Sequence, residues 1–344
     1  PGSTHKLGRE ARAVLDDSRN KLAAALGCAA KEVYFTSGGT ESDNMALTGA
    51  ARANKRAGNH LITSSIEHPA IINTMRFLEE EEGFRVTYLP VDQYGRIRLD
   101  ALKEALCEDT ILVSIMYVNK EVGSVQPIQE AASIVKAYNK DILFHVDAVQ
   151  GFGKYKIYPK KLKVDMCSIS GHKIHGPKGV GALYIGENVK IRPIVYGGGQ
   201  QHDMRSGTEN VPGIIGLGTA AARAAATMEE RAKKEIEMRD YLISRVLDEI
   251  PYTKLNGHPE KRLPNNANFS FRFIEGESLL IRLDMAGICG SSGSACTSGS
   301  LDPSHVLMAI GLPHEIAHGS LRLTLNEEIT REEIDYVVEQ LKTI

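Results

Sequence analysis

Residues 167–185 read Cys-Ser-Ile-Ser-Gly-His-Lys-Ile-His-Gly-Pro-Lys-Gly-Val-Gly-Ala-Leu-Tyr-Ile. They place Lys173 between two apolar runs that are typical of buried strands, with a glycine-rich turn after the lysine. Desolvation lowers the pKa of a lysine, and a neutral amine can form a Schiff base with a carbonyl. Pyridoxal phosphate (PLP) is the cofactor that uses a lysine in this way. A surface turn with an exposed lysine is the alternative, and this stretch alone does not decide between the two.

Strand-like and helix-like segments alternate along the chain before this stretch. The strand-like segments are residues 32–35, 60–63, 85–89, 110–116 and 142–147. Such alternation predicts an α/β fold with a mostly parallel central sheet and flanking helices. After Pro251 the elements become shorter, which is typical of a smaller α+β domain. We therefore expect a large domain over residues 1–230 and a small C-terminal domain over residues 231–344.

The overall composition excludes several classes of protein. The chain has 344 residues, of which 42% are hydrophobic and 24% charged, as in an ordinary globular protein. Its formal net charge of -2 predicts no attraction to nucleic acid or to an anionic membrane, and no apolar stretch is long enough to span a bilayer. The five cysteines are irregularly spaced without a Cys-x-x-Cys pair, so we expect neither a disulfide framework nor a structural metal site. A reducing, cytoplasmic compartment fits this pattern best.

An anion site is predicted in the loop Thr36-Ser-Gly-Gly-Thr-Glu-Ser-Asp-Asn44, which lies between a predicted strand and a predicted helix. Glycines let backbone N–H groups approach an anion, and the helix N-terminus adds its dipole. Gly39 and Thr40 would then bind a phosphate group. The alternative is that Thr40 and Asp43 form a helix capping box, which would explain Thr40 without the two glycines.

Polar residues also follow two other predicted strands. Asp147 ends one of them, where α/β sheets bind ligands, and a carboxylate there can keep a pyridinium nitrogen protonated. Gln150 follows closely and could reach the hydroxyl of the same ring. His68 comes after another strand, where it could stack on an aromatic cofactor and move protons. The alternatives are an aspartate that caps the next element and a histidine with a structural role only.

A second distinctive stretch is Ser-Ser-Gly-Ser-Ala-Cys-Thr-Ser-Gly-Ser, residues 291–300. A buried structural cysteine prefers apolar neighbours, so Cys296 in this polar loop is predicted to be exposed and movable, as a nucleophilic thiol needs to be. A flexible linker that happens to contain a cysteine is the alternative. Arg322 lies in the apolar strand 320–325, where it would bind a substrate carboxylate or, equally well, form an internal salt bridge.

Together these motifs resemble the class V aminotransferase-like PLP enzymes, and within them the cysteine desulfurases of the iron–sulfur assembly and nitrogen-fixation type. The resemblance covers essentially the whole chain. Its most specific parts are Phe-Thr-Ser-Gly-Gly-Thr-Glu-Ser-Asp-Asn, Glu-His-Pro-Ala, His-Val-Asp-Ala-Val-Gln, Ser-Gly-His-Lys-Ile-His-Gly-Pro-Lys-Gly, Arg-Ser-Gly-Thr and Ser-Ser-Gly-Ser-Ala-Cys-Thr-Ser. It implies the PLP-dependent transferase type I fold. The long Ser/Gly loop is similar to that of the branch with an extended catalytic loop.

The resemblance implies how the cofactor would be bound. Lys173 would carry PLP as a Schiff base, Asp147 would pair with the pyridine nitrogen, and Gln150 would bond the ring oxygen. His68 would stack on the ring. The phosphate would be held by Gly39, Thr40, Ser170, His172 and, from the other subunit of a homodimer, Thr208.

The resemblance also implies L-cysteine as the substrate. Asn119 and Arg322 would bind its carboxylate, and the amine of Lys173 would move its Cα proton. Cys296, as a thiolate, would attack the substrate sulfur, which leaves a persulfide on Cys296 and alanine as the product. An iron–sulfur scaffold or another sulfur-acceptor protein would then receive the sulfur.

Three features depart from the family pattern. Family members begin with a segment that contains an Asn-Ala-Thr-Thr-like motif, whereas this sequence opens after the corresponding position, at Pro1. The last helix stops early at Ile344, and Lys120 stands where many relatives carry asparagine. Two rival functions stay open: a selenocysteine lyase, because its cofactor is the same and its site nearly the same, and a PLP-binding protein that is inactive because it lacks the N-terminal segment.

Overall fold

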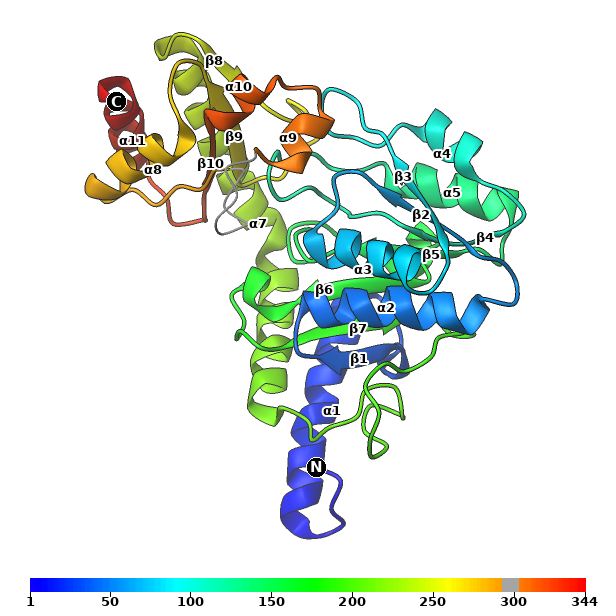
Figure 1. Cartoon of the computed structure of the whole chain (residues 1–344). Helices are drawn as coiled ribbons and strands as arrows, with labels where there is room; N and C mark the ends of the chain where they lie inside the picture. Colours follow the sequence, from blue (N-terminus) through cyan, green and yellow to red (C-terminus); the bar gives the residue numbers. More distant parts are fainter. Residues whose placement is uncertain (293–302) are drawn as a thin grey trace. The chain divides into compact units, whose positions relative to one another are not determined.

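A computed structural model describes residues 1–292 and 303–344 of the protein (Figure 1). They form two compact units. Unit 1 contains residues 1–89, 99–117 and 127–227, and unit 2 contains residues 90–98, 118–126 and 228–344. Two short segments from the first half of the chain thus belong to unit 2. The sequence predicts two domains, residues 1–230 and 231–344. This division stays a prediction.

The core of unit 1 is a sheet that has, within the described residues, seven strands in the order β1-β7-β6-β5-β4-β2-β3. The strands are β1 Val33–Thr36, β2 His60–Ser64, β3 Arg85–Leu89, β4 Thr110–Ser114, β5 Leu143–Asp147, β6 Met166–Ser170 and β7 Gly181–Ile185. Strands β2 to β6 are parallel, whereas β7 is antiparallel to both of its neighbours. The predicted α/β fold with a mostly parallel sheet is confirmed.

Helices cover this sheet, so its strands read as continuous apolar runs. All residues of β2, β4, β5, β6 and β7 are buried, as is typical of strands that are covered on both faces. The helical elements are α1 Lys6–Leu26, η1 Ala30–Glu32, α2 Gly39–Asn54, α3 Pro69–Glu80, α4 Leu99–Ala105, α5 Ile128–Tyr138, α6 Pro159–Leu162, η2 Gly171–Ile174 and the first part of α7 Val211–Glu249. Helix α2 packs on the strands from β4 to β7 and lies beside α3 (Figure 1).

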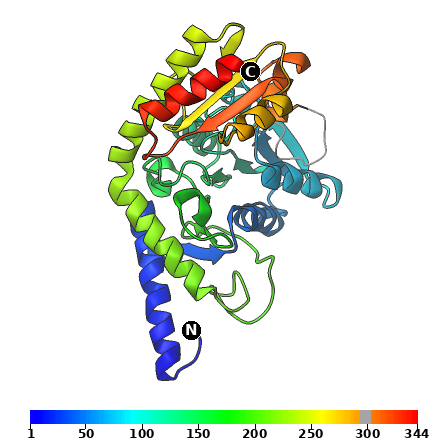
Figure 2. The ribbon, with the colours of Figure 1, turned by 90° about the vertical axis from the view of Figure 1, so that its left-hand side faces the viewer.

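Helix α1 lies along the first part of α7 (Figure 2). The close approach requires Gly218 of α7, since a Cβ there would stand 2.8 Å from the Cα of Ser18 in α1. Helix α1 ends where Gly27 adopts a left-handed conformation with φ of 61°, which closes the helix with bonds to two of its last carbonyls.

The strand directions bring several loops to one edge of the sheet. Because β2 to β6 are parallel, their carboxyl ends lie at the same edge, and β1 runs the same way since both β1 and β6 are antiparallel to β7. The chain first adds β3 outside β2 and then returns to place β4 on the other side of β2. Ligands of open α/β sheets bind outside the carboxyl ends of the strands at such a reversal.

Unit 2 is a smaller α+β unit, as the sequence predicts. In the part of the chain that the structure describes, its sheet has three antiparallel strands in the order β10-β9-β8. Its elements are β8 Thr253–Leu255, β9 Asn266–Phe271, α8 Gly276–Met285, α9 His305–Ala309, α10 His314–His318, β10 Ser320–Thr324, α11 Arg331–Thr343 and the second part of α7. Its core contains Phe269 and Leu321 from the sheet and Leu279 and Val338 from the helices.

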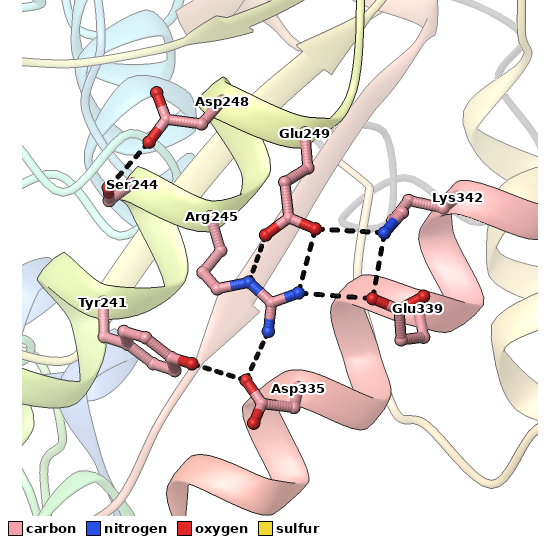
Figure 3. A network of polar contacts seen from close by, with 8 residues as sticks. All are labelled: Tyr241, Ser244, Arg245, Asp248, Glu249, Asp335, Glu339 and Lys342. Atoms are coloured by element: carbon pink, nitrogen blue, oxygen red, sulfur yellow. Dashed lines mark hydrogen bonds and ion pairs between the residues drawn. The ribbon is translucent and has the colours of Figure 1, made fainter.

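An ion-pair network joins the end of α7 to α11 (Figure 3). The Arg245 guanidinium donates to Glu249 on its own helix and to Asp335 and Glu339 on α11. Lys342 donates to Glu249 and to Glu339, at 3.0 Å in each case. Arg245, followed by Lys342, lowers the pKa of Glu249 to about 2. The network is partly exposed, from 20% for the Arg245 side chain to 56% for that of Glu339, so salt screens it and its contribution to stability is modest.

Replacing Arg245 with alanine should lower the melting temperature by a few degrees at neutral pH and low salt. A lowered pKa stabilises the fold fully above the unfolded value of about 4.3, and this contribution is lost as the pH falls toward about 2. The difference between the wild type and R245A should therefore be constant down to about pH 4.5 and shrink below it. Thermal unfolding followed by circular dichroism measures this difference.

Lys234→Ala is the matched control, because Lys234 pairs with a single exposed carboxylate on the same helix, Glu230, at 3.6 Å. It should change the melting temperature less than R245A. An R245A protein that melts at the same temperature as K234A would show that the network does not stabilise unit 2.

Candidate active site

The residues that the sequence predicts to bind an anion, 36–44, include the N-terminus of α2. Gly38 is the N-cap residue, with φ of 155°, and no side chain caps the helix. The first N–H groups of a helix have no partner inside it, so these groups and the helix dipole favour an anion. Thr40 lies inside the first turn and is exposed. The alternative in which Thr40 caps the helix is therefore wrong.

Gly39 lets this helix end approach two other loops of unit 1. A Cβ on Gly39 would stand 2.6 Å from Cγ2 of Val149 and 3.7 Å from Cβ of Ser170. No side chain fits at the first of these distances. The loop after β1, the turn after β5 and the end of β6 therefore meet at Gly39, although they are far apart in the sequence.

Lys173 lies in the short helix η2, between β6 and β7, so the predicted strand–turn–strand arrangement is present. The lysine is half-buried. Ser170, the last residue of β6, hydrogen-bonds through its Oγ to Nδ1 of the exposed His172 at 2.9 Å. Partial desolvation of the ring, followed by the positive charges of Lys173 and Lys178, lowers the pKa of His172, so this ring is neutral at neutral pH. A hydroxyl, an imidazole and an amine thus lie within four residues at the end of β6.

Asp147 ends β5 at the same edge and is 7% exposed. Its Oδ1 accepts a hydrogen bond from the Val149 N–H at 2.9 Å. The alternative that the sequence left open, a capping aspartate, is therefore present as well, and it fixes the carboxylate at the strand end. Gln150 follows in the same turn and is half-buried.

His68 is the N-cap residue of α3, the helix after β2. Its Nδ1 accepts from the Ala70 N–H at 3.1 Å. His68 therefore does have the structural role that the sequence left open, as a helix cap, and this role has a chemical consequence. Because Nδ1 is an acceptor, the neutral ring carries its proton on Nε2.

Sequence reasoning missed a buried polar network behind Asp147. His145 hydrogen-bonds at 2.9 Å through one ring nitrogen to the Ser114 hydroxyl and through the other to the Ser168 hydroxyl. Its Nε2 lies 3.8 Å from Oδ1 of the buried Asp43 on α2. Burial lowers the pKa of His145 to about 3, so the ring stays neutral. Since His145 stands two residues before Asp147, the alternation of a strand places both on one face, and this signal could have found it.

Two buried carboxyls, Asp43 and Glu67, are held in the protonated state near Asp147. Burial and then the charge of Asp147 raise the pKa of Asp43 well above its usual range. Burial raises the pKa of Glu67 to about 8, although this carboxylate accepts from the Ser64 hydroxyl at 2.5 Å and from the Met116 N–H at 3.0 Å. At neutral pH these two acids therefore add no negative charge beside Asp147.

The remaining predicted residues lie elsewhere. Asn119 and Arg322 belong to unit 2 and are described below by themselves. Thr208 is exposed on unit 1, in a loop whose Arg205 forms a bidentate pair with Glu41 of α2 at 2.7 and 3.1 Å. Cys296 lies outside the described residues.

In unit 2, Asn119 is buried and its Oδ1 accepts from the N–H groups of Glu121 and Val122 at 2.8 and 3.1 Å. Arg322 lies on β10 and its Nη1 donates to the Lys120 carbonyl at 3.5 Å. Within residues 1–292 and 303–344 Arg322 forms no ion pair, so the internal salt bridge that the sequence left open is not found there.

Comparison with known proteins identifies relatives over the whole chain. The sequence profile of the family described as Aminotransferase class-V matches residues 2–337. A relative from Methanosarcina thermophila, "Cysteine desulfurase IscS", is 52% identical over 100% of this chain and 84% of its own length. Among solved structures, "NIFS-LIKE PROTEIN" has a TM-score of 0.93 and 40% identity, and covers 100% of this chain and 90% of its own. "SspA in complex with cysteine" has a TM-score of 0.82 and 35% identity, with 96% and 91% covered.

Glu67→Gln should flatten the pH dependence of stability. Because the folded pKa of about 8 lies above the unfolded value of about 4.3, the stabilisation is full below pH 4.3 and is lost as the pH rises to about 8. Above about pH 6.5, where His145 no longer contributes, the wild type should lose up to ~1.4 kcal/mol of unfolding free energy per pH unit from this group. Asp43 adds a slope of the same sign, so in urea denaturation curves E67Q should show a smaller slope than the wild type, by the contribution of Glu67.

Glu80→Gln provides the control, since Glu80 is an exposed carboxylate on the helix that follows Glu67. It should keep the slope of the wild type. Equal slopes in the wild type and E67Q would mean that Glu67 is ionised in the folded protein.

Proposed function

The chain belongs to the aminotransferase class-V family, and from this premise we propose that it is a PLP-dependent cysteine desulfurase. It converts L-cysteine to L-alanine and transfers the sulfur to Cys296. Relatives named cysteine desulfurase, about 50% identical over the whole chain, support the reaction. The observation that carries the proposal is the meeting at one sheet edge of a lysine, a carboxylate and a glycine-lined helix N-terminus.

The residues at this edge fit PLP by the chemistry of their groups. The N-terminus of α2 with Gly39 and Thr40, together with the Ser170 hydroxyl and the His172 ring, offers N–H and O–H donors to a phosphate. Thr208 would add a hydroxyl from the second subunit of a homodimer. Gly39 supports this assignment, because a Cβ at this position would collide with Val149.

The other end of the cofactor fits the residues that follow β2 and β5. Asp147 would hold the ring nitrogen in its protonated form, and Gln150 would bond the ring oxygen. His68 would stack on the ring face, with its orientation fixed by the cap that it provides to α3. The neutral states of Asp43, Glu67 and His145 leave Asp147 as the charged group for the ring nitrogen. When bound, PLP supplies an electron sink for the electron pair released at the substrate Cα.

The protein residues would then carry out four tasks. Asn119, through its amide N–H₂ group, and Arg322, through its guanidinium, would bind the carboxylate of L-cysteine. The Lys173 amine would remove the Cα proton and return a proton to the product. The Cys296 thiolate would attack the substrate sulfur: a sulfur–sulfur bond forms, the Cβ–sulfur bond breaks, and its electron pair stays on the carbon skeleton. Protonation of that carbon gives alanine.

A sulfur-acceptor protein, such as an iron–sulfur scaffold, would take the persulfide sulfur from Cys296. A homodimer in the cytoplasm is the remaining part of this proposal. In a homodimer the exposed Thr208 of the second subunit would reach the phosphate, and the odd number and irregular spacing of the cysteines support a reducing compartment.

Two substitutions separate the cofactor from the sulfur chemistry. Lys173→Ala should abolish both the visible absorbance of bound PLP and the formation of alanine from L-cysteine. Cys296→Ala should keep the absorbance and lower alanine formation by more than ~10³-fold, because it removes the nucleophile. Absorbance spectra and amino-acid analysis measure the two effects.

Cys289→Ala is the matched control, because Cys289 is an exposed cysteine close to Cys296 in the sequence. It should keep both properties. A C296A protein with wild-type alanine formation would contradict the persulfide mechanism. If C296A turns over L-selenocysteine faster than the wild type turns over L-cysteine, the result would favour a selenocysteine lyase.

A further inference from the structure

Arg205 of unit 1 pairs its guanidinium with the carboxylate of Glu41, although the two residues are 164 positions apart in the sequence. Nε of Arg205 donates to Oε1 of Glu41 at 2.7 Å, and Nη2 donates to Oε2 at 3.1 Å. The two side chains are only 25% and 16% exposed, so salt screens their interaction weakly. Each charge is therefore largely compensated by the other.

Glu41 lies in the first turn of α2, directly after Gly39 and Thr40, which we propose as donors to the cofactor phosphate. Its Oε2 also accepts from the Ser37 N–H at 3.1 Å and from the Ser37 hydroxyl. Although burial acts to raise it, hydrogen bonds from Arg205 and Ser37 lower the pKa of Glu41 below its usual range. The carboxylate is thus ionised at neutral pH, at the helix end where the phosphate would bind.

The loop that carries Arg205 is also fixed by contacts other than this pair. Gln201 and the two residues after it adopt left-handed conformations, with φ of 47°, 55° and 62°. These conformations cost free energy for residues other than glycine, so surrounding contacts must hold them. Oε1 of the buried Gln201 accepts from the Phe35 N–H at 2.9 Å and from Nη2 of Arg19 at 3.1 Å. Phe35 belongs to β1, which leads into residues 36–41, so the loop is tied to the core of unit 1 beside the start of α2.

The stability of α2 does not account for the pair between Arg205 and Glu41. A carboxylate in the first turn of a helix is favourable without any cation, because the N–H groups and the helix dipole stabilise it. A phosphate would use the same N–H groups and dipole, and at neutral pH it carries more negative charge than a carboxylate. Two anions at one helix end repel each other unless a cation compensates one of them. Arg205 supplies this cation, and its two hydrogen bonds direct it to Glu41.

We propose that Arg205 is a positioning residue for the cofactor phosphate: by pairing with Glu41 it removes the repulsion between this carboxylate and a phosphate at the N-terminus of α2. The inference rests on the PLP-binding part of the proposed function and is independent of the sulfur chemistry. It requires that Arg205 matter for binding only while Glu41 is charged. A residue that bound the phosphate itself would be needed in either case.

The test is a double-mutant cycle on the full chain, with PLP and pyridoxal as probes. Pyridoxal has the same ring but no phosphate. After hydroxylamine has removed the cofactor, each protein is titrated with either probe, and visible absorbance gives the Kd. Arg205→Ala should weaken PLP binding about 30-fold and pyridoxal binding less than about threefold. Glu41→Gln should bind PLP at least as tightly as the wild type, and E41Q/R205A should lie within about threefold of E41Q.

Arg52→Ala is the matched control, because Arg52 forms an ion pair of similar exposure with Glu82 near the other end of α2. Its Nε donates to Oε1 of Glu82 at 2.9 Å. R52A should lower the melting temperature about as much as R205A and leave both Kd values unchanged. If R205A does not fold, Arg205→Gln takes its place in the cycle, since glutamine keeps a donor and most of the length but lacks the charge.

Four results would overturn the inference while the wild type binds PLP. They are an unchanged PLP Kd in R205A, a loss in R205A that is equal for PLP and pyridoxal, an equal loss of PLP affinity in E41Q and R205A, and a double variant that binds PLP as weakly as R205A. The last result would mean that Arg205 acts on the phosphate directly or through Thr208.

The wild type tests the proposed function separately. A wild type that gives no visible absorbance with PLP would overturn the cofactor part of that function and this inference with it. A wild type that binds PLP but forms no alanine from L-cysteine would overturn the desulfurase reaction alone. The two failures are therefore distinguishable.

Discussion

Parallel hydrogen bonding from β2 to β6 is the constraint on which the candidate site depends. It aligns the carboxyl ends of five strands at one edge, and the antiparallel β7 brings the end of β1 to the same edge. Four of the loops that leave this edge each contribute one kind of group: N–H donors after β1, an imidazole after β2, a carboxylate after β5 and an amine after β6. Residues between Gly38 and Lys173 therefore meet without any long-range sequence pattern that specifies their contact.

The same packing sets the charge of the site. Helix α2 buries Asp43 against β5 and β6, and the loop after β2 buries Glu67, so both acids keep their protons and His145 stays neutral. If these two side chains were exposed to water, both would be ionised at neutral pH. Their neutral state is thus a property of the fold, and it concentrates the negative charge at Asp147.

The sequence predicted the fold correctly, and it indicated the residues of the proposed cofactor site because most of them lie at or just after the end of a strand and belong to a short local motif. Gly39 and Lys173 are examples: a glycine pair at a helix start and a lysine between two apolar runs are visible in a few residues. Local motifs alone did not decide between a capping role and a cofactor-binding role for Asp147 and His68. In the structure both side chains do accept hydrogen bonds from the backbone of neighbouring segments. The pair between Glu41 and Arg205 could not be predicted, because it joins residues 164 positions apart and depends on how unit 1 folds.

The proposed chemistry is divided between residues of unit 1, which would hold the cofactor, and residues of unit 2, which would hold the substrate carboxylate and carry the acceptor thiol. The most direct test of this account is mass spectrometry of the Cys296 peptide after the PLP-loaded protein has reacted with L-cysteine in the absence of reductant. The account predicts one added sulfur atom on Cys296, accompanied by an equal amount of alanine, and neither product in K173A. Alanine formation without any sulfur on Cys296 would contradict it.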